Sequence, residues 1–230
     1  MSQLLVTKKQ ITDAGYAIAC FLTFIAVVSS LSRYLLSHDL HMQIASILYG
    51  EPYTEVQFAE LSKRPIQEFI HRVVGAAYMI IGLLQFTPSF RKKNWKLHRV
   101  LGRVFVIFSL LVGLGGIYMG LSYPFAGWRE TVPTLLFGGL FIYFVFMGYR
   151  RARQRKILEH QLWMIRSFSI ALGIATIRII VLAVNTLTDI EYNKIFIFAF
   201  WCAWTMHLVL TEAGIYLAFT RKVKKVQYAG

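Results

Sequence analysis

Long stretches without a single charged residue dominate the chain. Four of them cover residues 14–32, 73–90, 104–128 and 131–149. Each is close to or longer than the roughly 18 apolar residues that mark a candidate transmembrane helix. Four membrane-spanning helices are therefore predicted from the length of these runs alone.

Two further apolar stretches are interrupted by ionisable residues. Residues 167–188 contain Arg178, and residues 195–220 contain His207 and Glu212. Counting both as spans predicts an all-α fold, a polytopic membrane helical bundle of six transmembrane helices. The expected spans, within a single integral membrane domain over residues 1–230, are 12–36, 69–90, 99–122, 131–149, 161–186 and 194–219.

Composition agrees with this pattern, because 57% of the residues are hydrophobic and only 16% are charged. Soluble globular domains usually carry about 25% charged residues. The first apolar run lacks the short core and small-residue cleavage site of a signal peptide, so it is expected to stay as the first helix. Cys20 and Cys202 fall inside spans and form no CxxC motif, so neither a disulfide framework nor covalently attached haem is expected.

The formal net charge of +14 has to be interpreted from where the charged residues lie along the chain. Most of the 25 basic residues fall on one side of the predicted membrane, and most of the acidic residues fall on the other. The positive-inside rule therefore predicts that both termini are cytoplasmic. No nucleic-acid recognition motif accompanies the charge, so nucleic acid is not an expected partner. The basic segments are residues 8–9, 91–103, 150–166 and 221–225.

The only long connection is the outer loop, residues 37–68. It is expected to hold a short amphipathic helix at about residues 42–48 and a turn at residues 50–52. The remaining connections are short. Any function is therefore expected within the bilayer or at its two faces.

A near-repeat starts the second and third predicted helices. HRVVGAAY begins at His71 and HRVLGR at His98. Because consecutive spans run in opposite directions, the two motifs are expected at opposite membrane surfaces. Glycine follows histidine by four residues in both, which leaves room for a flat ligand or for a neighbouring helix. The alternative is that His and Arg only anchor the helix ends and Gly only serves packing.

The segment HQLWMIRS opens the fifth predicted helix and places His160 at nearly the depth of His98. If these helices face each other, the two imidazoles are candidate ligands of a haem iron, or of another metal. Guanidinium groups are good partners for haem propionates. Candidates for that role are Arg99, Arg103 and Arg166. The alternative is that His160 is an interface anchor and Arg166 extends towards the headgroups.

Other polar residues are expected inside or near the bilayer. His207 and Glu212 are intramembrane polar candidates, since ionisable groups at such depth often have a function. His207 is equally well explained by hydrogen bonding between helices. An outer polar cluster, able to hold an anionic headgroup or a quinone oxygen, is predicted from His71, Arg72, Arg178 and Arg33.

Taken together, HRVVGAAY, HRVLGR, HQLWMIRS and the TIRI around Arg178 resemble an uncharacterised family of bacterial multi-pass membrane proteins, known as a domain of unknown function. The resemblance covers the second to fifth predicted helices. It implies a protein of the bacterial inner (plasma) membrane and supplies no catalytic residue. The arrangement also loosely resembles di-haem b-type cytochromes and ferric reductases. Here only His98 and His160 form a pair, so one haem is better supported than two.

Three functional hypotheses follow from the sequence. The first is a redox protein that binds b-type haem and exchanges electrons with quinone or a membrane redox partner, which would make it a membrane oxidoreductase. The second is a non-redox transporter or lipid-binding protein. The third is an assembly or scaffolding factor for a membrane complex. Soluble-type hydrolase or nucleotide chemistry is not indicated, because no corresponding motif occurs.

Overall fold

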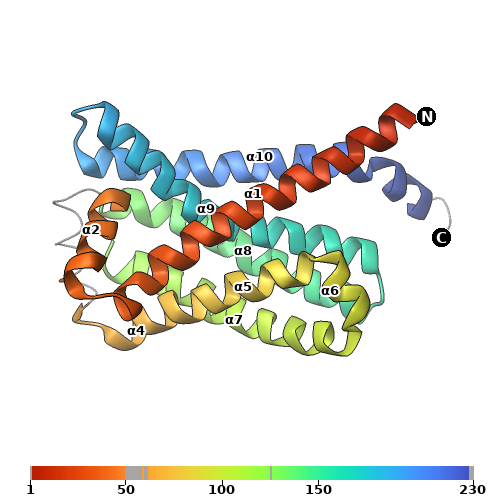
Figure 1. Cartoon of the computed structure of the whole chain (residues 1–230), viewed down its shortest axis with the longest axis horizontal. Helices are drawn as coiled ribbons and strands as arrows, with labels where there is room; N and C mark the ends of the chain where they lie inside the picture. Colours follow the sequence, from red (N-terminus) through yellow and green to blue (C-terminus); the bar gives the residue numbers. More distant parts are fainter. Residues whose placement is uncertain (1, 50–58, 60–61, 125, 228–230) are drawn as a thin grey trace.

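The computed structural model describes residues 2–49, 59, 62–124 and 126–227, and these residues are almost entirely helical, with no strand. Figure 1 shows the arrangement. The helices are α1 (Ser2–Leu35), α2 (His38–Tyr49), α4 (Pro65–Phe69), the π-helical turn η1 (Ile70–Val74), α5 (Gly75–Phe86), α6 (Pro88–Lys93), α7 (Trp95–Ser122), α8 (Trp128–Arg153), α9 (Ile157–Leu187) and α10 (Tyr192–Gln227). The all-α prediction is confirmed.

Six helical segments are long and apolar enough to cross a membrane, as predicted. They are Lys9–Leu35, Pro65–Phe86, Trp95–Ser122, Trp128–Arg153, Ile157–Leu187 and Tyr192–Phe219. The second span begins four residues earlier than expected and ends at Phe86 instead of residue 90. Thr87 is extended and Pro88 has no N–H to continue the helical hydrogen bonds, so α6 starts there as a separate helix.

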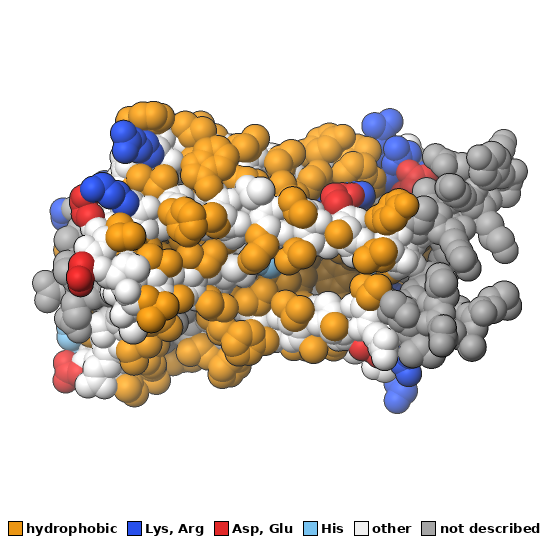
Figure 2. All heavy atoms as spheres, turned by 90° about the horizontal axis from the view of Figure 1, so that it is seen from above, with side chains coloured by type: hydrophobic (Ala, Val, Ile, Leu, Met, Phe, Trp, Pro, Cys, Tyr) orange, Lys and Arg blue, Asp and Glu red, His pale blue; other side chains and the backbone are white. Residues whose placement is uncertain are grey.

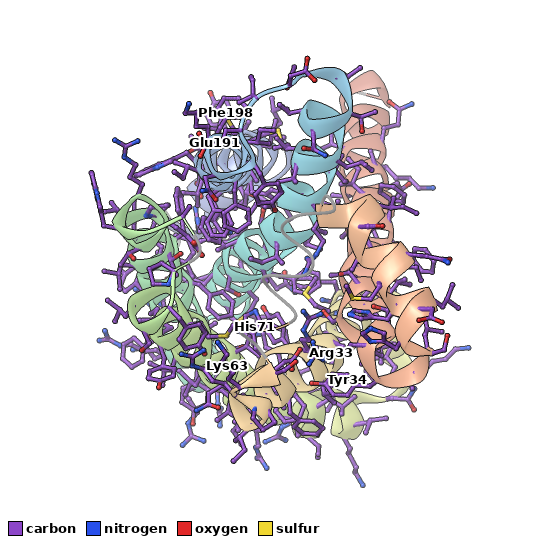
Figure 3. All side chains as sticks on the ribbon, turned by 90° about the vertical axis from the view of Figure 1, so that its left-hand side faces the viewer. Arg33, Tyr34, Lys63, His71, Glu191 and Phe198 are labelled. Atoms are coloured by element: carbon purple, nitrogen blue, oxygen red, sulfur yellow. The ribbon has the colours of Figure 1, made fainter. Side chains whose placement is uncertain are left out.

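The two ends of the bundle differ in charge. Figure 1 places both chain termini at one end, together with α6 and the turn between α8 and α9. This is the basic end, which carries Arg91, Lys92, Lys93 and Arg150. The opposite end holds α2, Glu68 of α4, Glu130 in the first turn of α8, and Glu191, which is labelled in Figure 3, and is the acidic end. In Figure 2 hydrophobic side chains cover most of the surface between the two ends.

The long loop predicted at residues 37–68 is partly helical. The expected amphipathic helix exists as α2, which is longer than predicted and packs against α1 and α9. The turn predicted at residues 50–52 lies outside the described residues. The side chain of His41 is buried and its Nδ1 lies 3.0 Å from Ser32 Oγ on α1. This contact fixes α2 across the acidic end.

Helix α9 is the central helix of the bundle, since it packs against α1, α2, α8 and α10. An aromatic core lies beside it, in which Tyr78 of α5 stacks on Phe105 of α7 with ring centroids 4.6 Å apart. Phe168 of α9 approaches Gly82 so closely that a Cβ there would lie 2.3 Å from its ring. Gly82 is therefore required for α5 and α9 to enclose this core.

Glycines also bring α7 and α8 together. A Cβ at Gly120 would lie 2.6 Å from Thr134, and one at Gly138 would lie 2.9 Å from Ile117. Small residues allow such close approach of membrane helices, where van der Waals packing replaces the hydrophobic effect as the driving force. The resulting α7–α8 pair forms one wall of the candidate site.

Candidate functional site

A cavity of about 260 Å³ lies inside the acidic half of the bundle. Its lining comes from α1, α4, η1, α5, α7, α8, α9 and α10. The cavity is close to the lower end of the range of ligand sites in proteins, which is roughly 300–1,000 Å³. We regard it as the candidate functional site.

The backbone is irregular where the HRVVG motif lines this cavity. The first four letters of that motif fall in the π-helical turn η1, and Gly75 begins the regular helix α5. Single π-turns inside α-helices occur frequently at functional sites, because the extra residue redirects the side chains of that turn. His71 and Arg72 both line the cavity.

Glu68 joins this turn to α1 through two ion pairs. Its Oε1 lies 2.9 Å from Arg33 Nε and 3.1 Å from Arg72 Nε. Arg72 also donates to the backbone oxygen of Ser29, at 3.3 Å, and Arg33 donates to Ser62 Oγ at 2.9 Å. The predicted cluster of Arg33 and Arg72 therefore exists, and it is organised around a carboxylate.

His71 lies inside the ring of helices in Figure 3, which views the acidic end. Its ring packs over α7, with Cε1 3.7 Å from the position of a Cβ at Gly116. Arg178 of α9 lines the same cavity and donates to Ile174 O at 3.1 Å. The predicted proximity of His71 and Arg178 is thus present in the structure.

Four polar atoms of the cavity lining are buried without a hydrogen-bond partner. Glu68 Oε1 is ion-paired with Arg33 and Arg72, whereas the other three are His71 Nδ1, Tyr78 Oη and Tyr123 Oη. Tyr123 follows the end of α7, and Arg64 covers its ring at 4.0 Å from the centroid. Burial raises the pKa of Tyr123, although Arg64 opposes this effect. The phenol therefore keeps its proton and can donate it in a hydrogen bond to a ligand.

The charged side chains that line the cavity balance formally. Arg72 and Arg178 are basic, and Glu68 and Glu130 are acidic. Glu130 accepts a hydrogen bond from the backbone N–H of Ala126 at 2.9 Å, near the start of α8. The polar end of the cavity thus combines a neutral sum of the lining charges with the unpartnered His71 Nδ1 and Tyr123 Oη.

The rest of the cavity is apolar and rich in aromatic rings. Phe137 packs on Trp204 with ring centroids 5.1 Å apart, and Phe200 packs on Trp204 at 4.8 Å. Trp204 donates its indole N–H to Ile170 O at 3.2 Å, so its own polar atom is satisfied. The aromatic residues that line the cavity are Tyr78, Tyr123, Phe141, Phe196, Phe200 and Trp204.

The other histidine pair lies at the basic end, outside this cavity lining. His98 of α7 and His160 of α9 are within electrostatic range of each other, although α8 packs against both helices. His160 Nδ1 donates to Gly148 O at 2.8 Å, which leaves Nε2 as its second ring nitrogen. The two residues share one end, as predicted.

The three arginines predicted as propionate partners lie differently. Arg99 and Arg103 are exposed on α7. Arg166 forms a bidentate pair with Glu212 of α10, at 2.5 Å from Nε and 2.8 Å from Nη2. Arg166 is thus engaged by Glu212, and the role of the three arginines with haem stays a prediction.

His207 is held between α9 and α10. Its Nε2 lies 2.8 Å from Thr176 Oγ1 and its Nδ1 lies 3.2 Å from Ser169 Oγ. Both ring nitrogens thus have partners, which matches the interpretation of His207 as an interhelical hydrogen-bonding residue. Among the residues that the structure describes, no group of three or more His, Cys, Asp and Glu side chains is placed to hold a metal ion.

Comparison with known protein families shows which family the chain belongs to. The model of a family described as "Predicted membrane protein (DUF2306)" matches residues 68–215. The chain belongs to this family. The matched region begins at Glu68 and includes all the cavity-lining residues except those on α1. No curated protein and no solved structure matches the chain.

Several residues of the cavity lining were not predicted as site residues from the sequence. Tyr123, Glu130 and Thr134 lie at or near the turn between α7 and α8, where polar residues are ordinary and give no signal. The glycines at 113, 116 and 120 do have a recognisable sequence pattern, because spacings of three and four place them on one helical face. That face packs against α8 and His71.

Proposed function

We propose that the protein binds a small uncharged lipophilic molecule in the cavity at the acidic end. The observation that carries this proposal is the pair of buried, unpartnered polar atoms, His71 Nδ1 and Tyr123 Oη, at one end of an aromatic and apolar cavity. Buried polar atoms usually have a partner, and leaving one without a partner costs roughly 1–3 kcal/mol. A ligand with hydrogen-bonding oxygens would satisfy both.

The formal charge balance supports an uncharged ligand head. Arg72 is already paired with Glu68, which also pairs with Arg33 outside the lining, and the two acidic and two basic side chains of the lining itself sum to zero. An anionic ligand would have to compete with these carboxylates inside a low-dielectric environment, where charge is costly. A neutral head that exchanges hydrogen bonds avoids that cost.

Quinones and their reduced diphenols are the chemical class that we infer for the ligand. Their ring is flat, which suits a cavity lined by aromatic side chains such as Phe141, Phe200 and Trp204. Their oxygens accept or donate hydrogen bonds, which matches His71 and Tyr123. Their tails partition into the bilayer. The proposal concerns binding, and electron transfer would additionally need a redox partner.

The location follows from the same charge pattern that predicts the topology. We infer a bacterial inner membrane protein whose basic end faces the cytoplasm, because Lys and Arg are favoured on that side. The acidic end, with His71 and Tyr123, would then lie towards the outer surface. A ligand dissolved in the bilayer could enter there without crossing the membrane.

The haem hypothesis rests on a different part of the molecule. It is supported by the position of His98 and His160 at the same end of the bundle. It is also supported by the hydrogen bond from His160 Nδ1 to Gly148 O, which would leave Nε2 to face a metal. The cavity, however, lies at the other end of the bundle. The lipophile proposal rests instead on the cavity beside His71.

The test is a binding titration of the purified protein in detergent. The ligands are a short-tailed quinone, a primary alcohol with the same tail, and an anionic lipid, phosphatidylglycerol. Quenching of tryptophan fluorescence reports the quinone, because Trp204 is in the cavity wall, and competition against the quinone reports the other two. We expect saturable quinone binding that neither competitor displaces at equal concentration.

Substitution of His71 adds the residue-level test. His71→Leu removes the ring nitrogen and is expected to weaken quinone binding about tenfold, in line with roughly 1–1.5 kcal/mol for one hydrogen bond. His71→Gln keeps a polar group there and should restore most of the affinity. Displacement by the anionic lipid alone, or equal affinity in both variants, would contradict the proposal.

A further inference from the structure

A second cluster of cationic and titratable side chains lies at the basic end, away from the cavity. Arg91 of α6, His98 of α7 and His160 of α9 come from three different helices. Each member is within electrostatic range of the other two. An arginine beside two imidazoles disfavours their protonation, and a bound anion would relieve this effect.

The described residues supply no compensating carboxylate for this cluster. Glu159 is the nearest acidic residue in sequence, and it is paired with Arg151 Nε at 3.0 Å and with Lys156 Nζ at 3.6 Å. No ion pair involves Arg91 within the part of the chain that the structure describes. A negatively charged partner from outside the chain would complete the cluster.

Nitrogen atoms beside the cluster are also unsatisfied. His98 Nδ1 and Gln85 Nε2 are buried and have no hydrogen-bond partner. Gln85 lies against the same face of α7, because its Oε1 is 3.9 Å from the position of a Cβ at Gly102, one turn beyond His98. Glycine at 102 leaves this side of the cluster open. Two further hydrogen bonds are thus available to an acceptor.

The ring of His160 is oriented by its bond to Gly148 O, at 2.8 Å from Nδ1. That bond leaves Nε2 to contact a ligand. Trp95 stacks on His98 with ring centroids 5.4 Å apart, and Trp95 is exposed. Exposed tryptophan is typical of the membrane–water interface, so the cluster lies at the level of lipid headgroups.

We propose that Arg91, His98 and His160 form a binding site for a phosphate group at the basic end of the bundle. The site would take one tetrahedral oxyanion, with Arg91 contributing charge-assisted hydrogen bonds and Gln85 contributing a neutral one. Clustered basic groups between membrane helices bind anionic lipid headgroups in this way. The phosphate of an anionic phospholipid and free inorganic phosphate share this chemistry.

The surrounding charges make a lipid phosphate the natural source. Lys92, Lys93 and Lys96 are exposed next to the cluster, and each basic residue near an anionic membrane surface adds about 1 kcal/mol of attraction. This site is independent of the quinone proposal, because none of its residues lines the cavity.

The experiment measures retained lipid and phosphate binding on the intact protein. Native mass spectrometry after detergent washing counts bound phosphatidylglycerol and phosphatidylcholine. A thermal shift with inorganic phosphate reports the free anion. The variants are Arg91→Gln and His98→Gln. The matched control is Arg99→Gln, which removes one charge from the exposed face of the same helix end.

We expect retention of phosphatidylglycerol over phosphatidylcholine, and about a tenfold loss of retention in Arg91→Gln and His98→Gln but not in Arg99→Gln. Stabilisation by inorganic phosphate that the same two variants lose, without retained lipid, would support the site with a free anion as its ligand. Equal loss in all three variants, or no selectivity for either probe, would overturn the proposal. A haem absorbance band that His98→Gln abolishes would overturn it as well.

Discussion

Glu68 Oε1 lies 2.9 Å from Arg33 Nε, and this contact ties the segment before the π-helical turn to the end of α1. The same oxygen is 3.1 Å from Arg72 Nε. The carboxylate is nearly inaccessible, with 4% of its side chain exposed. It therefore holds two guanidinium groups beside the cavity, which Glu68 and Arg72 line.

Glu68→Gln should strongly destabilise the fold. Breaking a buried pair costs about 3–5 kcal/mol, because the partner charge stays buried and uncompensated. The free energy of unfolding, measured by denaturant titration in mixed micelles, reports the loss. Glu191→Gln is the control, since Glu191 pairs with Lys194 at an exposed position, and should cost less than about 1 kcal/mol. Equal costs would contradict the importance of the Glu68 network.

His41 should make stability depend on pH. Its pKa is lowered from 6.5 to about 4 by burial and then by Arg72, Arg33 and His38. Between about pH 4 and pH 6.5, His41 therefore binds a proton in the unfolded chain but not in the folded chain. The stability is fully present above pH 6.5 and falls as the pH drops towards 4, by up to about 3 kcal/mol.

His41→Gln should remove this dependence while a polar contact with Ser32 remains available. Thermal unfolding between pH 7 and pH 4 measures it. His38→Gln, at an exposed position of the same helix, is the matched control. An unchanged pH profile in His41→Gln would contradict this prediction.

Gly82→Ala should disrupt the aromatic core. The added methyl group would lie 2.3 Å from the ring of Phe168 and 2.9 Å from that of Phe105, so packed rings would have to move. Overpacking of this kind costs about 1–3 kcal/mol. Gly139→Ala is the control, because a Cβ there meets nothing within 4 Å. The melting temperature of Gly82→Ala should be clearly lower than that of Gly139→Ala. Equal melting temperatures would contradict the close packing of Phe168 and Phe105 on Gly82.

His207→Leu should lower stability by about 1 kcal/mol, since hydrogen bonds between membrane helices average about 0.6 kcal/mol and reach about 1.7. It should leave quinone affinity unchanged, because His207 does not line the cavity. Parallel unfolding and binding measurements check both statements. Loss of binding without loss of stability would assign His207 a role in ligand passage, as a transporter would require.

The six spans could be predicted because the bilayer fixes the length and polarity of a crossing helix. The same logic placed His71 and His98 at opposite ends of the bundle. Helix contacts could not be predicted in this way, since any apolar face can meet another or meet lipid. The bidentate pair of Arg166 and Glu212 and the position of α8 beside both α7 and α9 depend on those contacts.

Only some of the residues that line the candidate site could be predicted from the sequence. Its charged half, with Arg72 and Arg178, follows from ionisable residues inside or next to apolar runs. Its other half depends on Tyr123, which follows α7, and on a π-helical turn that no local pattern of residues predicts. Pattern reasoning favoured His98 and His160 because paired histidines suggest metal chemistry, whereas the described cavity lies beside His71.

The most direct test of the account is the quinone dissociation constant of Tyr123→Phe compared with that of Tyr118→Phe. The first substitution removes only the buried, unpartnered hydroxyl of Tyr123. The second removes the hydroxyl of an exposed neighbour whose ring centroid is 6.0 Å from that of Tyr123. We predict about a five- to tenfold weaker affinity for Tyr123→Phe, worth roughly 1 kcal/mol, and no change for Tyr118→Phe. Identical constants for wild type and Tyr123→Phe would contradict the proposal that this cavity binds the ligand through Tyr123.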